Sequence, residues 1–165
     1  MLDEIESDSV IFIDSNIFLY VILSHPRYRY SCKRFLERVD EGDLHGLTSV
    51  LVCNEVVHRL MIAEVVEKLN VEPKSAVEHI KKNYTVIGEL KKAWNALEVI
   101  NQIENLRIEE IDRQILMDAV EFSKKYGLLS NDAFHVAVMK KYGVKNIATN
   151  DKDFERVDWI KVWKP

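Results

Sequence analysis

The chain has 165 residues, of which 47% are hydrophobic and 30% are charged, as is typical of one globular domain with a normal core. Its formal net charge of −4 argues against broad electrostatic binding of nucleic acid, although an acidic chain can still carry local basic patches. Cys32 and Cys53 show no disulfide or metal-binding spacing. The acidic residues 1–9 lack the basic start of a signal peptide. The apolar segment 11–23 is too short to span a bilayer. We therefore expect a soluble cytoplasmic protein that does not enter a membrane.

The first predicted strand, residues 9–14, is a run of apolar residues that ends at Asp14. Such a run is typical of a strand buried on both faces, as in a parallel sheet. Asp14 would then stand at the carboxyl end of the strand, where open α/β sheets place their ligands. We expect Ser15 to cap the helix that follows, which stops before Pro26. The next predicted elements are a helix over residues 27–40, a strand over 44–48 and a long helix over 49–69.

The middle of the chain is helical in its pattern. Pro73 is suited to the first turn of a helix that continues to Asn83. A second helix is predicted over residues 87–105, with one apolar stripe consisting of Leu90, Ala93, Trp94, Leu97 and Ile100. We interpret residues 70–106 as a helical hairpin that is inserted into the domain and lies on its core.

The alternation of strands and helices then resumes. A strand is predicted over residues 106–111, and two helices follow, one capped by Asp112 and one capped by Ser130. The last elements are a strand over 146–149, a turn of helix over 151–154 and an edge strand over 159–163. Strands that alternate with helices predict an α/β domain over residues 1–165, with a mainly parallel sheet covered on both faces.

Four acidic residues break the local apolar pattern. Asp14 and Asp151 end interior strands, whereas Glu55 and Asp132 lie in helices among residues that should face the core. A lone buried carboxylate is costly unless it is paired or binds a metal. We therefore predict that these acids converge at one edge of the sheet. Mg²⁺ and Mn²⁺ prefer such oxygen ligands, and without an accompanying set of histidines and cysteines the cluster favours them over zinc.

Each of these acids also has a purely structural interpretation. Asp14 could cap the following helix, and Asp151 could cap the turn after it. Glu55 has Arg59 four residues on, which is the spacing of an ordinary helical ion pair. Asp132 lies in a first helical turn, where a carboxylate offsets the helix dipole. The metal-site hypothesis therefore depends on the four acids together.

Two histidines lie near these acids in the sequence. His135 follows Asp132 by three residues, and His58 follows Glu55 by three residues. His135 could approach the site, but for both we favour core histidines whose hydrogen bonds are satisfied.

A basic and aromatic segment follows the first strand. It begins at residue 25 and combines cations, which could bind phosphates, with aromatic faces, which could stack on unpaired bases. The candidate contacts to single-stranded RNA are Arg27, Arg29, Lys33 and Arg34. The alternative is an ordinary solvated helix face.

Four stretches of the chain resemble the PIN-domain ribonucleases, the family that includes the VapC-type toxins. They occur in the family's order and leave about residues 70–106 unmatched. The stretches are Phe12 to Asn16, Asn54 to Val56, Leu129 to Ala137 and Ile147 to Phe154.

The resemblance implies a three-layer α/β/α sandwich and Mg²⁺- or Mn²⁺-dependent endonucleolytic cleavage of RNA that leaves a 5′-phosphate and a 3′-hydroxyl. It also implies a homodimer and a possible antitoxin partner, although the long helical insertion argues against a toxin role more than against the chemistry. Ser15 stands where Thr is more usual in the family. Carried over by position, the metal-binding quartet is Asp14, Glu55, Asp132 and Asp151, with Asp153 as a further acid and Asn16 and Thr149 as supporting polar residues.

Other functions fit less well. A phosphatase of the haloacid-dehalogenase type needs a second Asp two residues after the first, where this chain has Asn16. A receiver-type phosphoacceptor would need an acidic pair before its first helix and a later lysine after a strand, and neither is convincing here. A catalytically weak or inactive PIN-like scaffold that binds RNA or protein stays open as the alternative.

Overall fold

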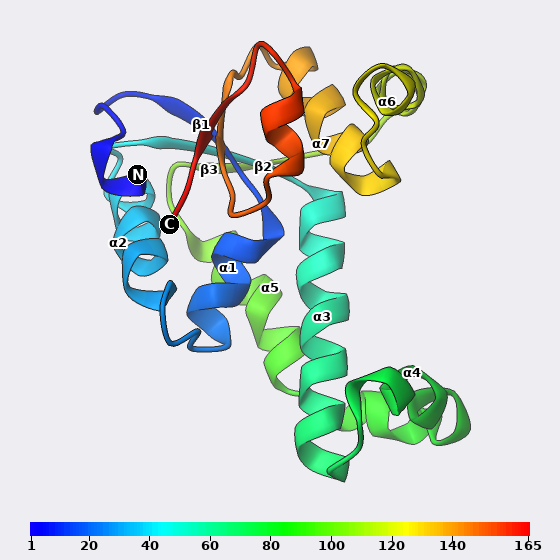
Figure 1. Ribbon diagram of the computed structural model, residues 1–165. Coiled ribbons are helices and arrows are strands. Elements are labelled where there is room, and N and C mark those ends of the chain that lie inside the picture. The colour runs from blue at the N-terminus through cyan, green and yellow to red at the C-terminus, as the bar shows by residue number, and fades with distance from the viewer.

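Five strands form a single, entirely parallel sheet in the computed structural model, which describes residues 1–165 (Figure 1). In chain order they are β1 (Val10–Ile13), β2 (His45–Ser49), β3 (Leu106–Glu109), β4 (Asn146–Ala148) and β5 (Lys161–Trp163). Their order across the sheet is β3-β2-β1-β4-β5. The predictions of a parallel sheet and of an edge position for the last strand are therefore confirmed.

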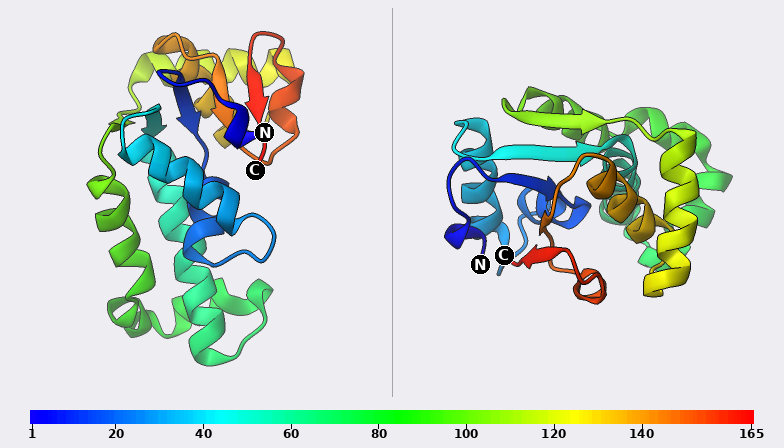
Figure 2. Two further views of the ribbon diagram at one scale, coloured as in Figure 1. Left: turned by 90° about the vertical axis from the view of Figure 1, so that its left-hand side faces the viewer. Right: turned by 90° about the horizontal axis from the view of Figure 1, so that it is seen from above.

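Helices cover both faces of this sheet, with α1 and α2 on one side and α6 and α7 on the other (Figures 1 and 2). The prediction of a three-layer α/β/α fold is thereby confirmed. No helix combines the length and the apolar character needed to cross a membrane. The α-helices are α1 (Ser15–Ile22), α2 (Arg29–Asp40), α3 (Val50–Leu69), α4 (Pro73–Lys82), α5 (Lys92–Gln102), α6 (Arg113–Tyr126) and α7 (Ser130–Lys141), and the 3₁₀ helices are η1 (Leu2–Glu4), η2 (Tyr84–Glu89) and η3 (Asp153–Arg156).

The strand order reverses direction at β1. The chain proceeds from β1 to β2 on one side, and later places β4 on the other side. Ile13 is in register with Ala148, so the chain leaves β1 at Asp14 beside the point where it leaves β4 at Thr149. Open α/β sheets form a crevice at the carboxyl ends of the strands at such a reversal. The fold therefore sets the end of the first strand beside the end of the fourth.

The sheet fits its neighbours closely at two points. The residues Ile11, Phe12 and Ile13 of β1 are completely buried, as their apolar run predicts. At Gly46 of β2, an added Cβ would lie only 2.8 Å from the side chain of Leu106. Glycine at this position therefore allows close packing of β2 against its surroundings.

Helix caps differ from the sequence predictions in two places. Asp14, rather than Ser15, is the N-cap of α1, and its side chain accepts the Ser15 N–H, so the capping interpretation of Asp14 is confirmed. Ser130 is the first residue of α7 and not its cap, because the N-cap is Leu129, which has no capping side chain. The prediction that Asp112 caps α6 is confirmed by a hydrogen bond of 2.8 Å.

A helical arm (residues 60–102) extends away from the sheet (Figures 1 and 2). The later turns of α3 form one side of the arm, α4 lies at its far end, and α5 returns beside α3. The hairpin joins the core through α3: α4 and α5 pack mainly on that helix, and their buried residues, among them Ala76, Ala93 and Ile100, belong to the same hydrophobic core as those of the sheet. The single helix predicted over residues 87–105 is in fact η2 followed by α5, and Trp94 is 41% exposed rather than part of the packed stripe.

A buried acid holds the arm together. Glu64 of α3 is only 5% exposed. Its carboxylate accepts the backbone N–H groups of Lys91, Lys92 and Ala93 at 2.8, 2.9 and 3.4 Å. These groups belong to the first turn of α5, which has no side-chain cap of its own. Glu64 therefore caps α5 from a different helix, a role that sequence spacing did not indicate.

Candidate active site

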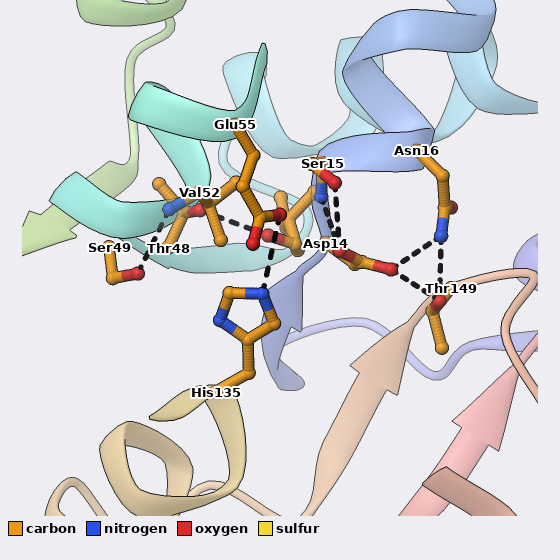
Figure 3. Close-up of polar contacts among 10 residues, drawn as sticks. Asp14, Ser15, Asn16, Thr48, Ser49, Val52, Glu55, His135 and Thr149 are labelled. Atoms are coloured by element: carbon orange, nitrogen blue, oxygen red, sulfur yellow. Dashed lines mark hydrogen bonds and ion pairs between the residues drawn. The ribbon is translucent and has the colours of Figure 1, made fainter. Parts of the chain in front are cut away.

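Asp14 is the most constrained acid at the carboxyl edge of the sheet (Figure 3). It is 6% exposed, and burial raises the pKa of its carboxyl. Oδ1 accepts the Ser15 N–H at 2.6 Å, and Oδ2 accepts the Thr149 hydroxyl at 2.6 Å together with the Asn16 side-chain amide. Asn16 also donates to the Thr149 oxygen at 2.8 Å. Asn16 and Thr149 thus fix the orientation of the Asp14 carboxylate.

Glu55 reaches the same edge from the second turn of α3. Its Oε2 lies 3.5 Å from Nε2 of His135. Burial would raise the pKa of Glu55, but hydrogen bonds from His135, Ser15 and Asn131 outweigh it and lower the pKa. The structure has no ion pair between Glu55 and Arg59, so the simple helical-pair interpretation is wrong.

His135 is buried but belongs to this cluster. It is 1% exposed, and its ring lies near those of Phe12 and Phe154, with centroids at 5.5 and 6.4 Å. Nε2 faces Glu55, whereas Nδ1 has no hydrogen-bond partner. The interpretation as a satisfied core histidine is therefore right about burial and wrong about its hydrogen bonds. The same interpretation is wrong for His58, which is exposed.

Asp132 comes to the site from the first turn of α7 and is partly buried. Burial raises its pKa to about 6, and the negative charges of Asp151, Asp14 and Asp153 add to this effect, while His135 opposes it. These three carboxylates therefore lie close enough to Asp132 to raise its pKa, which shows that negative charge is concentrated at this edge of the sheet.

Asp151 lies in the loop after β4, and Asp153 is the first residue of η3. Asp151 is exposed, and its carboxylate accepts the Asp153 N–H at 2.8 Å, as in the turn-capping alternative. Its own N–H donates to the Thr149 side-chain oxygen at 3.0 Å. Asp153 forms an ion pair with Arg156 at 2.7 Å. Asp151 is thus tied to the Asp14 cluster through Thr149, whereas Asp153 is engaged by a cation of η3.

The donor set at this edge fits a hard divalent cation. Ligand atoms of Asp14, Glu55 and His135 all lie within 4.8 Å of one another. The raised pKa values of Asp14 and Asp132 reflect burial of negative charge that the protein compensates only in part. One imidazole joins the oxygens, which the sequence interpretation did not include. A single nitrogen among several carboxylates still suits Mg²⁺ or Mn²⁺ better than a zinc site rich in His and Cys.

The candidate RNA contacts are not equivalent. Arg27 and Arg29 are exposed and form no ion pair, and the Arg27 guanidinium lies 5.2 Å from the centre of the Tyr28 ring. Lys33 and Arg34 lie 3.3 and 4.0 Å from carboxylates of α2 and η1. Of these four candidate contacts, Arg27 and Arg29 are therefore the two that have no acidic partner.

A cavity of about 460 Å³ opens next to the carboxylates. It is lined by Asn16, Tyr20, Asn150, Asp151 and Lys152. Sequence reasoning did not select Tyr20, Asn150 or Lys152. One signal for Tyr20 was present, because it follows Asn16 by four residues and so lies on the same face of α1.

Comparisons with known proteins agree with this fold. The PIN domain family matches residues 11–160. Ribonuclease VapC2 of Methanocaldococcus jannaschii is 29% identical over 156 residues, which cover 94% of this chain and 93% of the relative. Among solved structures, Mycobacterium tuberculosis VapC20, a toxin that cleaves the sarcin-ricin loop, aligns with a TM-score of 0.62 at 18% identity and covers 91% of this chain and 96% of its own. A toxin-antitoxin complex from Klebsiella pneumoniae aligns with a TM-score of 0.56 at 18% identity, over 92% of this chain and 95% of its own.

Proposed function

Since this chain belongs to the PIN-domain family, we propose that it is an endoribonuclease that hydrolyses phosphodiester bonds of single-stranded RNA with Mg²⁺ or Mn²⁺. The observation that carries the proposal is the close approach of Asp14, Glu55 and His135, within 4.8 Å, beside Asp132. The likeness to a curated ribonuclease over most of the chain supports the same activity.

The acidic residues have distinct roles in this proposal. Asp14, Asp132 and Asp151 would hold the ion most directly, with Asp153 as a further acid at the rim, and Glu55 would bind a second ion or orient the attacking water. The bound ion would activate water and offset negative charge at the scissile phosphate. Asn16 and Thr149 act through Asp14, because their hydrogen bonds fix its carboxylate.

Glu55 is the residue best suited to accept a proton from the attacking water. Its lowered pKa keeps it ionised at neutral pH, so it is free to act as a base. His135 lies 3.5 Å from its Oε2 and orients the carboxylate from the buried side. No nucleophilic side chain is needed, and both cysteines are buried, unpaired thiols whose pKa values are raised by burial.

The proposal predicts loss of cleavage when Asp14 is replaced by Asn. We expect wild type to cut a labelled RNA pool with Mg²⁺ or Mn²⁺ and not in EDTA, and we expect Asp14→Asn to reduce the rate by more than about 100-fold. Asp8→Asn is the matched control, because the Asp8 side chain is 92% exposed and its positive φ suits Asn. Circular dichroism would check that each variant is folded.

The outcomes separate the proposal from its alternative. Cleavage that persists in EDTA or in Asp14→Asn would rule out a metal-dependent nuclease at this site. Binding of RNA without cleavage by wild type would favour the PIN-like scaffold.

We further propose that the chain acts with an antitoxin partner, because the solved structures of similar fold include a toxin and a toxin-antitoxin complex. Growth arrest on expression, relieved by a protein encoded next to it, would support this role. Normal growth during expression of active nuclease would contradict it. The homodimer stays a prediction, which analytical ultracentrifugation can test.

A further inference from the structure

The cavity beside the carboxylates shares two of its lining residues, Asn16 and Asp151, with the candidate active site. It is a pocket broadly open to solvent, with a volume of about 460 Å³. A group bound here would therefore lie immediately next to the place where the phosphodiester bond is cut.

The polar groups of the cavity wall are held in fixed orientations. The Asn150 side-chain amide donates to the Tyr20 hydroxyl at 3.0 Å, and the Asn150 N–H donates to Oδ1 of Asn16 at 3.3 Å. These bonds leave the Tyr20 hydroxyl proton and the Asn150 side-chain oxygen available to a ligand. The cavity thus offers one donor and one acceptor, which is the combination that the edge of a nucleobase requires.

A second layer of aromatic rings keeps Tyr20 in place. Its ring centroid lies 4.6 Å from that of His25 and 5.0 Å from that of Tyr28. The rings of His25 and Tyr28 stack on each other at 4.8 Å and 17°. Nδ1 of His25 accepts the N–H groups of Arg27 and Tyr28, both at 3.2 Å, and the His25 N–H donates to the Tyr20 carbonyl at 2.9 Å, which ties the loop to the end of α1. Tyr20 is therefore a preorganised aromatic wall.

Two cations accompany this aromatic layer. Lys152 lines the cavity, is exposed and forms no ion pair. The Arg27 guanidinium lies 5.2 Å from the centre of the Tyr28 ring, which is part of the same aromatic layer. An aromatic platform combined with cations is the arrangement by which proteins bind unpaired nucleotides.

We propose that the cavity is the subsite for one unpaired nucleotide adjacent to the scissile phosphate. Its base contacts Tyr20 and Asn150, and its phosphate contacts Lys152. The inference rests on the proposed RNA cleavage, and it adds that cleavage depends on the identity of the base at this one position.

The test is the base preference at the cut site, read by sequencing the product ends from a random RNA pool. Wild type should show a bias at one position next to the cut. Asn150→Ala and Tyr20→Phe should flatten this bias, because each removes a group that recognises the base edge. Lys152→Ala should raise KM for all sequences about tenfold and leave the bias unchanged, as expected for a phosphate contact.

Tyr84→Ala is the matched aromatic control, because Tyr84 is 73% exposed in η2 of the arm. It should change neither KM nor the bias. Tyr20→Ala should raise KM about tenfold through loss of the aromatic contact to the base. If this variant does not fold, Tyr20→Phe and Asn150→Ala decide the question, because they keep the aromatic layer intact.

Failure of the subsite is distinguishable from failure of the nuclease proposal. If wild type cleaves RNA and the Tyr20→Phe and Asn150→Ala variants keep its base preference and its KM, the subsite proposal is overturned and the nuclease proposal stands. If wild type does not cleave, fluorescence anisotropy with a labelled single-stranded RNA decides. In that case Tyr20→Ala should weaken Kd about tenfold relative to Tyr84→Ala, and equal Kd values would overturn the subsite.

Discussion

His135 and Glu55 illustrate how a neighbour sets the chemistry of a buried acid. Burial alone would raise the pKa of Glu55, whereas His135, helped by hydrogen bonds from Ser15 and Asn131, gives a lowered pKa. Nδ1 of His135 has no partner, so the pair with Glu55 is the only polar contact of this ring. The position of the histidine therefore bears on how Glu55 functions and not only on packing.

Replacing His135 tests this coupling. We expect His135→Ala to lower kcat about 10- to 100-fold, as for other residues that orient a metal ligand. Because the hydrogen bond that lowers the Glu55 pKa is lost, the acidic limb of the pH–rate profile should move to higher pH. His135→Gln retains an N–H donor and should recover part of the rate. An unchanged profile in His135→Ala, with the fold intact, would show that His135 only fills space.

At the scale of single elements, the helical arm depends on one carboxylate. Glu64 joins α3 to the first turn of α5 through three backbone N–H groups. Such a contact links two helices that the sequence separates by more than a complete helix. The orientation of α5 along α3 therefore rests on a residue outside α5.

Glu64→Ala should destabilise the protein by about 1–3 kcal/mol, because the α5 N–H groups lose their buried acceptor. The measurement is urea unfolding, together with hydrogen exchange at Lys91, Lys92 and Ala93, which should become faster. Glu67→Ala is the control, since Glu67 is an exposed partner of Lys92 and its loss should cost about 0–1 kcal/mol. Equal effects of the two variants would refute the capping role of Glu64.

For the whole molecule, the concentration of negative charge at one sheet edge predicts an unusual dependence of stability on pH. Burial raises the pKa of Asp14 and raises that of Asp132 to about 6. Burial opposes protonation of His135, but Glu55, Asp14 and Asp132 outweigh it and raise the histidine pKa. Each of these groups holds its proton more tightly in the folded state, so the stabilisation that it contributes at low pH is lost as the pH rises through its folded pKa.

We therefore expect the metal-free protein to melt at a higher temperature at pH 5.5 than at pH 7.5. A difference of about 2–4 °C corresponds to about 1 kcal/mol in a protein of this size, after allowing for solvent screening at the partly exposed Asp132. Calorimetry in EDTA would measure it, and Asp132→Asn should reduce the difference. Added Mg²⁺ or Mn²⁺ should raise Tm more at pH 7.5, where the carboxylates are ionised. A Tm that rises between pH 5.5 and 7.5 without metal would contradict the expectation.

Much of the fold could be predicted because its signals are local. The apolar run before Asp14 predicts a buried parallel strand, and alternating strands and helices predict a sheet covered on both faces. The path of residues 70–106 could not be predicted this way, because an apolar stripe shows that a helix face is buried and not which partner buries it. The stripe faces α3 rather than the sheet, and Trp94 lies partly outside it.

The sequence by itself determined which residues could form the site. Four acids in apolar surroundings are visible in the chain because charge is costly in a core, whereas Asn16 and Thr149 were indicated by the resemblance to the PIN-domain family. The tertiary structure decided how they relate. The register of β1 against β4 brings Thr149 to Asp14, and the placement of α3 and α7 at the same edge of the sheet brings His135, rather than Arg59, to Glu55. These contacts join residues far apart in the chain, so no local pattern of sequence encodes them.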